Sequence, residues 1–224
     1  MSTSGQPPSF QRARRPEQRE ARRRVILENA AQLVAEMPVS DISLRELARR
    51  VGLSKTNVVR YFETREAVFF ALLNQAIDGW LDDLPAELPP ATASDTPSPA
   101  AVVDALARSV ADRPLICELW SSLGTELERN ISAEAVRAFK LAHTDLQVRL
   151  AGLLRQRIPA LTVPASRELV ALSILLIAGL WPFANPSPAV AEAVRDPLLA
   201  NSRVDFSDRL SRALVVTVTG LLTV

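Results

Sequence analysis

The segment at residues 44–62, LRELARRVGLSKTNVVRYF, constrains the fold more than any other part of the chain. Its apolar residues recur at helical spacing before Gly52, a residue type that commonly ends helices in the left-handed conformation. Ser54 follows as a typical N-cap for a second helix, and Ala48 places a small side chain where two helices would cross. The segment therefore predicts two short helices joined by a tight turn, as in a helix-turn-helix.

Helices are also predicted on both sides of this segment. A first helix is expected at about residues 16–37, and Pro38 ends it. Ser43 and Glu46 have the spacing of a capping box, in which each side chain binds a free backbone N–H of the first turn. Thr64 is expected to cap a further helix that runs to about residue 84. The apolar stripe of the first helix is formed by Ile26, Ala30, Leu33, Val34 and Met37.

The rest of the chain predicts more helices, separated by prolines. Residues 85–99 are rich in Pro, Ala, Ser and Thr and are expected to form an exposed, partly mobile linker. The later helices are expected at residues 100–112, 114–127, 132–157, 164–181 and 206–222, with a proline-rich loop before the last. Strand-type alternation is nearly absent, and glycine is scarce with 7 residues. An all-α fold follows.

The charge is unevenly distributed, although the net charge is only +1. Residues 1–65 hold thirteen Lys and Arg against seven Asp and Glu, and the remainder is acidic. A basic head on an acidic body suggests a polyanion-binding module carried by a separate domain. One His and one Cys, Cys117, cannot build a His/Cys metal site, so neither a metal nor another cofactor is expected.

No signal peptide is expected, because residues 1–10 are polar and no apolar run follows them. The most apolar stretch, residues 169–184, is expected to be too short to span a bilayer, and Pro182 interrupts it. These features predict a cytoplasmic protein with no membrane partner.

The second helix of the pair is polar on its outer side. Lys55, Thr56, Asn57 and Arg60 are the candidates for contacts with base edges in the major groove. The candidates for contacts with phosphates are Ser43, Ser54, Tyr61 and Arg65, helped by helix N-termini. Arg45 is a further DNA-binding candidate. The alternative is that this surface is only the solvated face of an ordinary helical hairpin.

These residues carry a family resemblance over residues 20–75. Gly52-Leu53-Ser54-Lys55, then Tyr61-Phe62, then Arg65-Glu66-Ala67-Val68 resembles the signature of the tetracycline-repressor (TetR) family of bacterial regulators. The preceding ISLRELA, residues 42–48, is similar to the second helix of that family. The departures are Val59 in place of an aromatic residue that often contacts phosphate, Thr56 for Gly, Asn57 for Thr and Arg65 for Lys. They indicate an operator of its own.

The resemblance implies a domain plan. It comprises a flexible basic arm at residues 1–15, a DNA-binding domain at 16–65 with a linking helix at 64–84, and a helical regulatory and dimerisation domain at 66–224. The last two helices would form a four-helix bundle with those of a second subunit, and the alternative is an intramolecular core. The expected interface residues are Leu169, Leu172, Ser173, Leu176, Ile177, Leu180, Leu210, Leu214, Val218 and Leu221.

The resemblance also places a small-molecule site among the middle helices. The candidates are Trp120, Leu123, Phe139, His143 and Trp181, each of which could equally be plain core. The expected function is therefore a homodimeric regulator, typically a repressor that a small apolar effector releases from a palindromic operator. The alternative is a DNA-binding regulator, for example an activator, that works without a ligand or with a protein partner. No catalytic triad, phosphate loop or metal motif indicates an enzyme.

Overall fold

The computed structural model describes residues 9–91, 96–129 and 131–223, with side chains from residue 17 onward. Within these ranges every regular element is a helix, which confirms the all-α prediction. The chain forms two compact units, Met1–Leu72 and Leu73–Val224. The boundary falls inside one helix, α4 (Arg65–Glu87), so the two units share a continuous helical backbone.

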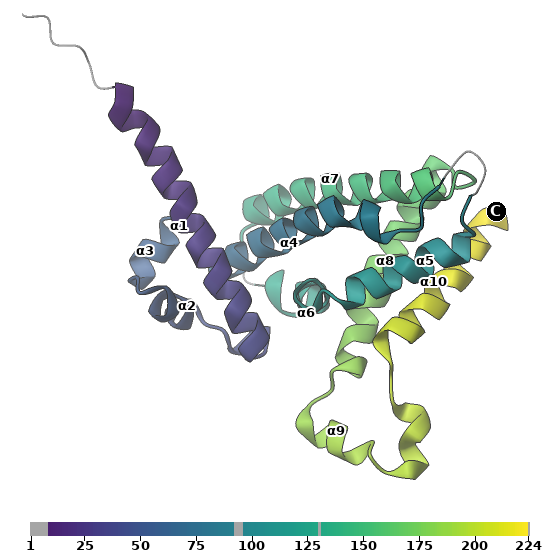
Figure 1. The fold of residues 1–224 in the computed structure, drawn as a ribbon. Helices are drawn as coiled ribbons and strands as arrows, with labels where there is room; N and C mark the ends of the chain where they lie inside the picture. Colours follow the sequence, from purple (N-terminus) through teal and green to yellow (C-terminus); the bar gives the residue numbers. More distant parts are fainter. Residues whose placement is uncertain (1–8, 92–95, 130, 224) are drawn as a thin grey trace, which may run out of the picture. The chain divides into compact units, whose positions relative to one another are not determined.

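The N-terminal unit consists of short helices arranged on one long helix (Figure 1). Its elements are α1 (Ser9–Glu36), the 3-10 turn η1 (Val39–Asp41), α2 (Leu44–Val51), α3 (Lys55–Val59) and the start of α4. Helix α1 begins before the predicted start at Pro16, so the backbone of residues 9–15, expected in the flexible arm, is helical. Residues 1–8 of that arm lie outside the described residues.

The turn between α2 and α3 follows the predicted residues closely. The Ser43 hydroxyl accepts the Glu46 backbone N–H at 3.1 Å, and the Ser54 hydroxyl accepts that of Asn57 at 3.2 Å. Gly52 ends α2 with a φ of 70°, the left-handed conformation that favours glycine. The capping box is only half formed, because the Glu46 carboxylate binds Arg49 instead of the start of its own helix. Helix α3 is also shorter than predicted, ending at Val59.

Buried apolar side chains hold these short helices together. The predicted crossing residue Ala48 is 3% exposed, and Val58 on α3 is completely buried. Ile26, Ala30 and Leu33 are the fully buried part of the stripe predicted on α1. A five-residue helix such as α3 cannot be stable alone, so this packing and the two serine caps define its position.

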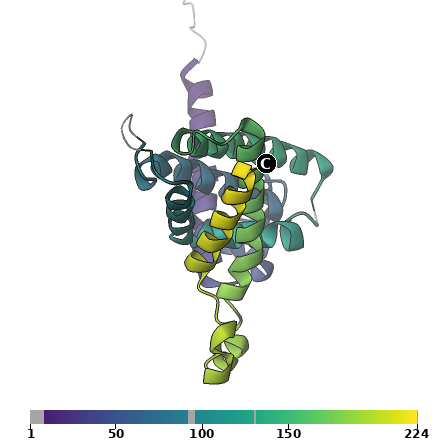
Figure 2. The ribbon, with the colours of Figure 1, turned by 90° about the vertical axis from the view of Figure 1, so that its right-hand side faces the viewer.

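The C-terminal unit packs its helices around α8 (Figures 1 and 2). After the end of α4 come α5 (Pro99–Ala111), α6 (Pro114–Ser122), the π-helical turn η2 (Leu123–Leu127), α7 (Ala133–Arg157), α8 (Val163–Ala184), α9 (Pro188–Ala193), the 3-10 turn η3 (Pro197–Ser202) and α10 (Phe206–Thr223). Helix α8 contacts α6, α7 and α10, and α10 also packs along α5. Serine or threonine side chains cap α5, α7 and α8.

Two proline-containing segments differ from the prediction. Helix α4 continues through Pro85, which was expected to begin the linker. Leu88, the residue after the end of α4, is only 3% exposed. Residues 92–95 of that linker lie outside the described part. Helix α8 likewise continues through Pro182, and α9 and η3 occupy what was expected to be a loop. In Figure 1 this connection extends away from the rest of the C-terminal unit.

Helix α8 is longer than the sequence suggested. By length and composition its 22 residues, which include Arg167 and Glu168, could cross a membrane, a test that the core helix of a soluble protein also passes. One side of the helix is buried in the chain's own core at Leu169, Ser173 and Ile177. The apolar character of α8 therefore has at least one explanation within the folded C-terminal unit.

Helices α4 and α7 run parallel to one another, and polar contacts join them along their length. His143 Nδ1 lies 3.0 Å from Asn74 Oδ1, and further along Arg149 pairs with Asp78 and Asp82. Near the end of both helices, Arg157 donates to the Pro85 carbonyl at 3.0 Å. These contacts fix α7 against the helix whose beginning belongs to the N-terminal unit.

Candidate nucleic-acid interface

The N-terminal half of α3 presents a polar surface to solvent. Lys55, Thr56 and Asn57 are all exposed, while Val58 faces the core. Val59, where the TetR resemblance would place an aromatic residue, is 40% exposed. The three exposed side chains are of the types that hydrogen-bond or contact base edges in the major groove. The structure thus leaves them accessible for the predicted role.

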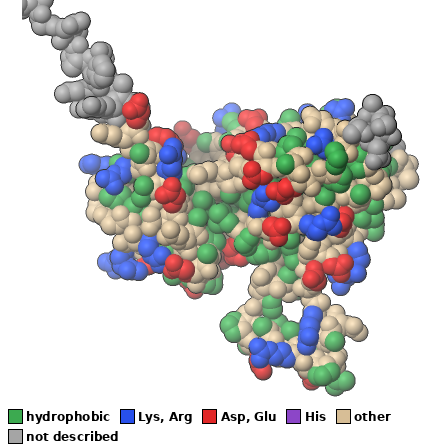
Figure 3. All heavy atoms as spheres, in the orientation of Figure 1, with side chains coloured by type: hydrophobic (Ala, Val, Ile, Leu, Met, Phe, Trp, Pro, Cys, Tyr) green, Lys and Arg blue, Asp and Glu red, His purple; other side chains and the backbone are tan. Residues whose placement is uncertain are grey.

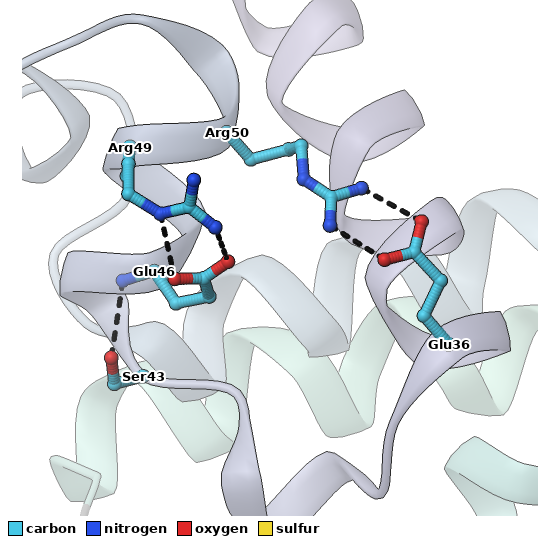
Figure 4. Close-up of polar contacts among 5 residues, drawn as sticks. All are labelled: Glu36, Ser43, Glu46, Arg49 and Arg50. Atoms are coloured by element: carbon cyan, nitrogen blue, oxygen red, sulfur yellow. Dashed lines mark hydrogen bonds and ion pairs between the residues drawn. The ribbon is translucent and has the colours of Figure 1, made fainter.

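Two ion pairs brace α2, which supports α3 (Figure 4). Arg50 forms two hydrogen bonds with the Glu36 carboxylate at the end of α1, one of 2.8 Å, and Arg49 binds Glu46 on its own helix. The hydrogen bonds from Arg50 and Arg49 hold the pKa values of Glu36 and Glu46 below their usual range. Both pairs lie at the surface, so they orient the helix more than they stabilise it.

Arg60 and Tyr61 lie beyond the end of α3, next to α1. Arg60 is the C-cap residue of α3, and its carbonyl accepts from the Arg19 guanidinium at 3.4 Å. The Tyr61 carbonyl accepts from Arg23 at 2.6 Å, and the Arg23 guanidinium also lies 4.1 Å from the centre of the Phe62 ring. Helix α1 is thereby attached to the segment that follows α3.

Arg65, which was predicted to contact a phosphate, makes several contacts inside the N-terminal unit. Its guanidinium donates to the carbonyls of Val39 and Ile42 and lies 3.2 Å from the Glu66 carboxylate. The side chain is 17% exposed. These donors satisfy carbonyls at the turn before α2, so Arg65 connects the start of α4 to that turn inside the N-terminal unit. Of the other residues predicted to contact DNA outside α3, Ser43, Arg45 and Ser54 are exposed and Tyr61 is half-buried.

Three of the five predicted pocket residues pack together in the C-terminal unit. The Trp120 indole N–H donates to His143 Nε2 at 3.4 Å, and the rings of Phe139 and His143 lie 5.0 Å apart. Because an indole can only donate, Nε2 must be the unprotonated nitrogen and Nδ1–H must donate to Asn74. Burial, and then the nearby Lys140 ammonium, lower the pKa of His143 to about 4, against the opposing effect of Glu128. His143 is therefore neutral near pH 7.

The other two pocket candidates lie elsewhere. The Trp181 indole donates to the Glu118 carboxylate at 2.9 Å, and its ring makes an edge contact with Phe206. Leu123 is half-buried at the start of the π-helical turn η2. The structure therefore brings Trp120, Phe139 and His143 together, whereas Trp181 makes a separate aromatic contact with Phe206.

The predicted dimer residues divide into two groups. Six of them lie in the chain's own core, namely Leu169, Ser173, Ile177, Leu210, Leu214 and Val218. The other four, Leu172, Leu176, Leu180 and Leu221, are half-buried. The most exposed large apolar residues of the same two helices are Leu175, Phe183 and Val216, at 67%, 72% and 74% exposure, and they were not among the predicted residues. The burial of these six residues within one chain is what the intramolecular alternative expects.

Comparison with known proteins gives the family of both units. Residues 26–72 match the family model of bacterial regulatory proteins of the tetR family, and residues 74–224 match that of the tetracyclin repressor-like C-terminal domain. The chain belongs to the TetR family. It is thus a DNA-binding transcriptional regulator of the helix-turn-helix type, as the sequence motif indicated.

Individual TetR-family relatives are similar to different extents. The HTH-type transcriptional regulator RutR of Escherichia coli is 35% identical over 66 residues, which cover 30% of this chain and 31% of that protein. A TetR regulator from Rhodococcus sp. RHA1 has a TM-score of 0.59 at 21% identity, over 91% of this chain and 96% of the other. FadR from Bacillus subtilis, solved with stearoyl-CoA, has a TM-score of 0.53 at 14% identity, over 86% and 97%. The structural matches show a shared fold.

The arginines of α1 that lie next to the end of α3 were not among the residues predicted from the sequence. Arg19, Arg22 and Arg23 lie on the part of α1 that contacts the end of α3. A signal was present, since the three arginines stand within four residues of one another and therefore share one side of a helix. From the sequence, a basic arm was instead expected before residue 16, and only the apolar stripe of the first helix was identified.

Replacing Arg65 by Lys should destabilise the protein even though the charge is kept. A lysine cannot bridge the Val39 and Ile42 carbonyls as the guanidinium does, so the free energy of unfolding should fall by about 2 kcal/mol. Urea unfolding followed by circular dichroism measures the change. Arg45→Lys, at an exposed position, serves as the control. A stable Arg65→Lys protein with weakened DNA binding would restore the phosphate role.

Neutral, buried His143 predicts a loss of stability in acid. The pKa of His143 is 6.5 in its unperturbed state and about 4 in the fold, so between these values the unfolded chain binds more protons. The free energy of unfolding should therefore decrease as the pH falls from 6.5 towards 4, by about 2 kcal/mol at pH 5. Urea titrations of the wild type and His143→Gln at about pH 7 and pH 5 isolate this contribution. An identical pH dependence in both proteins would contradict it.

Proposed function

We propose that this TetR-family protein is a homodimeric repressor that binds a palindromic operator and is released from it by a small apolar effector. The observation that carries the proposal is the exposed polar surface of α3, with Lys55, Thr56 and Asn57 presented on a braced helix-turn-helix. The basic N-terminal part of the chain supports contact with a polyanion. Such a regulator acts in the cytoplasm, where its DNA is.

The dimer part of the proposal rests on an apolar surface of α8 and α10. The two helices pack side by side (Figure 2), and Leu175 and Val216 are largely exposed on them. Exposed apolar residues that cluster with half-buried leucines are typical of protein interfaces. A second copy of the same surface would cover them, and the resulting two-fold symmetry would match a palindromic site.

The effector part of the proposal rests on how α4 is held. Asn74 on α4 contacts His143, which contacts Trp120 on α6, so a molecule that separates these side chains would act directly on α4. Operator and effector would then weaken each other's binding by the same factor. The close contacts among Trp120, Phe139 and His143 favour a second candidate, a regulator that works without an effector.

Selecting bound duplexes from a random pool tests the DNA-binding proposal. The wild type should enrich an inverted repeat, and Asn57→Ala should alter the preferred base at one position of each half-site and lose about 10- to 100-fold in affinity. Asn29→Ala, which changes an asparagine of α1, is the matched control. With the selected sequence placed over a promoter, the protein should lower reporter transcription. An increase would favour an activator, and an asymmetric motif would contradict dimeric binding.

Introducing charge on the α8 and α10 surface tests the dimer. Leu175→Glu combined with Val216→Glu should bury unpaired carboxylates and raise the dimer dissociation constant by at least about 100-fold. Sedimentation velocity measures the oligomeric state. Leu141→Glu makes the same change at a 53% exposed position on α7 and should leave the dimer intact. A double variant that sediments as the wild type does would contradict this interface.

A further inference from the structure

An arginine-lined groove lies between α1 and the end of α3, entirely within the N-terminal unit. We call it the α1 groove, and it is lined by Gln18, Arg19, Ala21, Arg22, Val25, Arg60 and Tyr61. Three of these seven residues carry a guanidinium and none carries a carboxylate. Arg60 was predicted to contact a base edge, whereas Arg19 and Arg22 were not among the predicted site residues.

Hydrogen bonds attach the two sides of the groove to each other. Arg23 holds the Tyr61 carbonyl at 2.6 Å and lies over Phe62, which joins α1 to the segment after α3. Arg19 adds a longer contact with the Arg60 carbonyl. The exposed side chains of Arg22 and Arg60 are therefore carried by two elements that side-chain-to-backbone hydrogen bonds join.

The groove arginines have no acidic partners in the described part of the chain. Glu20 pairs with Arg23 at 3.8 Å, whereas no ion pair to a described carboxylate involves Arg19, Arg22 or Arg60. Like charges brought together without a counter-charge attract an anion. Guanidinium groups match the oxygens of a phosphate in geometry as well as charge. A phosphodiester is the anion that a DNA-binding domain meets in this position.

The position of Arg60 separates it from the residues that face base edges. Lys55, Thr56 and Asn57 occupy the first turn of α3, whereas Arg60 follows its last residue. Recognition helices of this type contact bases through their N-terminal residues. At the other end of the helix, Arg60 shares its surroundings with Arg19 and Arg22 of α1 instead.

We infer that the α1 groove binds a DNA phosphate at the edge of each half-site, so that Arg60 contributes affinity and not base selectivity. The inference rests on the proposed DNA-binding function and assigns different roles to the residues of the DNA-binding surface. Asn57 and its neighbours select the sequence, and Arg60 with Arg22 anchors the domain to the backbone. This assignment replaces the sequence-based prediction that Arg60 reads a base.

Binding titrations at several salt concentrations test the inference with the full-length chain. Arg60→Gln and Arg22→Gln are measured by fluorescence anisotropy against the selected operator and against operators with one base pair changed at each position. Each variant should lose affinity by the same factor on all of these duplexes. The dependence of log K on log salt should become shallower by about 0.9 for each phosphate that the variant no longer binds. Trimming the duplex at its ends should abolish the difference from the wild type.

Arg24→Gln provides the matched control, because it removes the same charge from an exposed position of α1 outside the groove. It should change affinity less than Arg22→Gln. An Arg60→Gln protein that relaxes the base preference at one position would overturn the inference, as would equal losses in the control. If the wild type binds duplexes and Arg60→Gln leaves affinity unchanged, the groove assignment alone fails. If the wild type binds no duplex, the proposed function fails with it.

Discussion

The N-terminal unit depends on arginine side chains that bind backbone carbonyls at the ends of short helices. Arg65 donates to Val39 and Ile42 at the turn before α2, and Arg23 donates to Tyr61 after α3. Short helices leave a large share of their peptide groups unpaired, and α3 has only five residues. These guanidinium groups donate hydrogen bonds to carbonyls at the helix ends. They act together with buried Val58 and the Ser54 cap, which hold α3 itself.

Helix α4 begins in the N-terminal unit and continues into the C-terminal unit, where its later part contacts α7. Asn74 meets His143, and Arg149 and Arg157 make further contacts along the parallel helices. Two helices joined at successive points along their length cannot slide independently without breaking several of these contacts. A displacement of α7 would therefore carry α4, whose first residue is Arg65.

The helix caps could be predicted from the sequence. Whether a polar side chain such as Arg65 is exposed or contacts distant backbone could not. Ser43, Gly52 and Ser54 act through neighbouring backbone groups, so their roles as caps follow from residue type and spacing. Arg65 could not be assigned in this way, because its partners are carbonyls more than twenty positions away in the sequence. The helical backbone through Pro85 and Pro182 was missed for a related reason. Proline removes one hydrogen bond, and packing elsewhere along the helix can offset that loss.

Helix α8 shows most clearly why periodicity does not locate an interface. A helix that is apolar nearly all round has no polar side to mark which residues face outward. The structure resolves this by burying Leu169 and Ile177 within the chain and leaving Leu175 open on another side. Figure 3 likewise shows hydrophobic side chains exposed among charged ones on the surface of the protein. One helix thus has an inner side that stabilises the body and an outer side available to a second copy. In the proposed dimer, two α3 helices would read paired half-sites only at a fixed separation, so the outer side of α8 would set that separation without touching DNA.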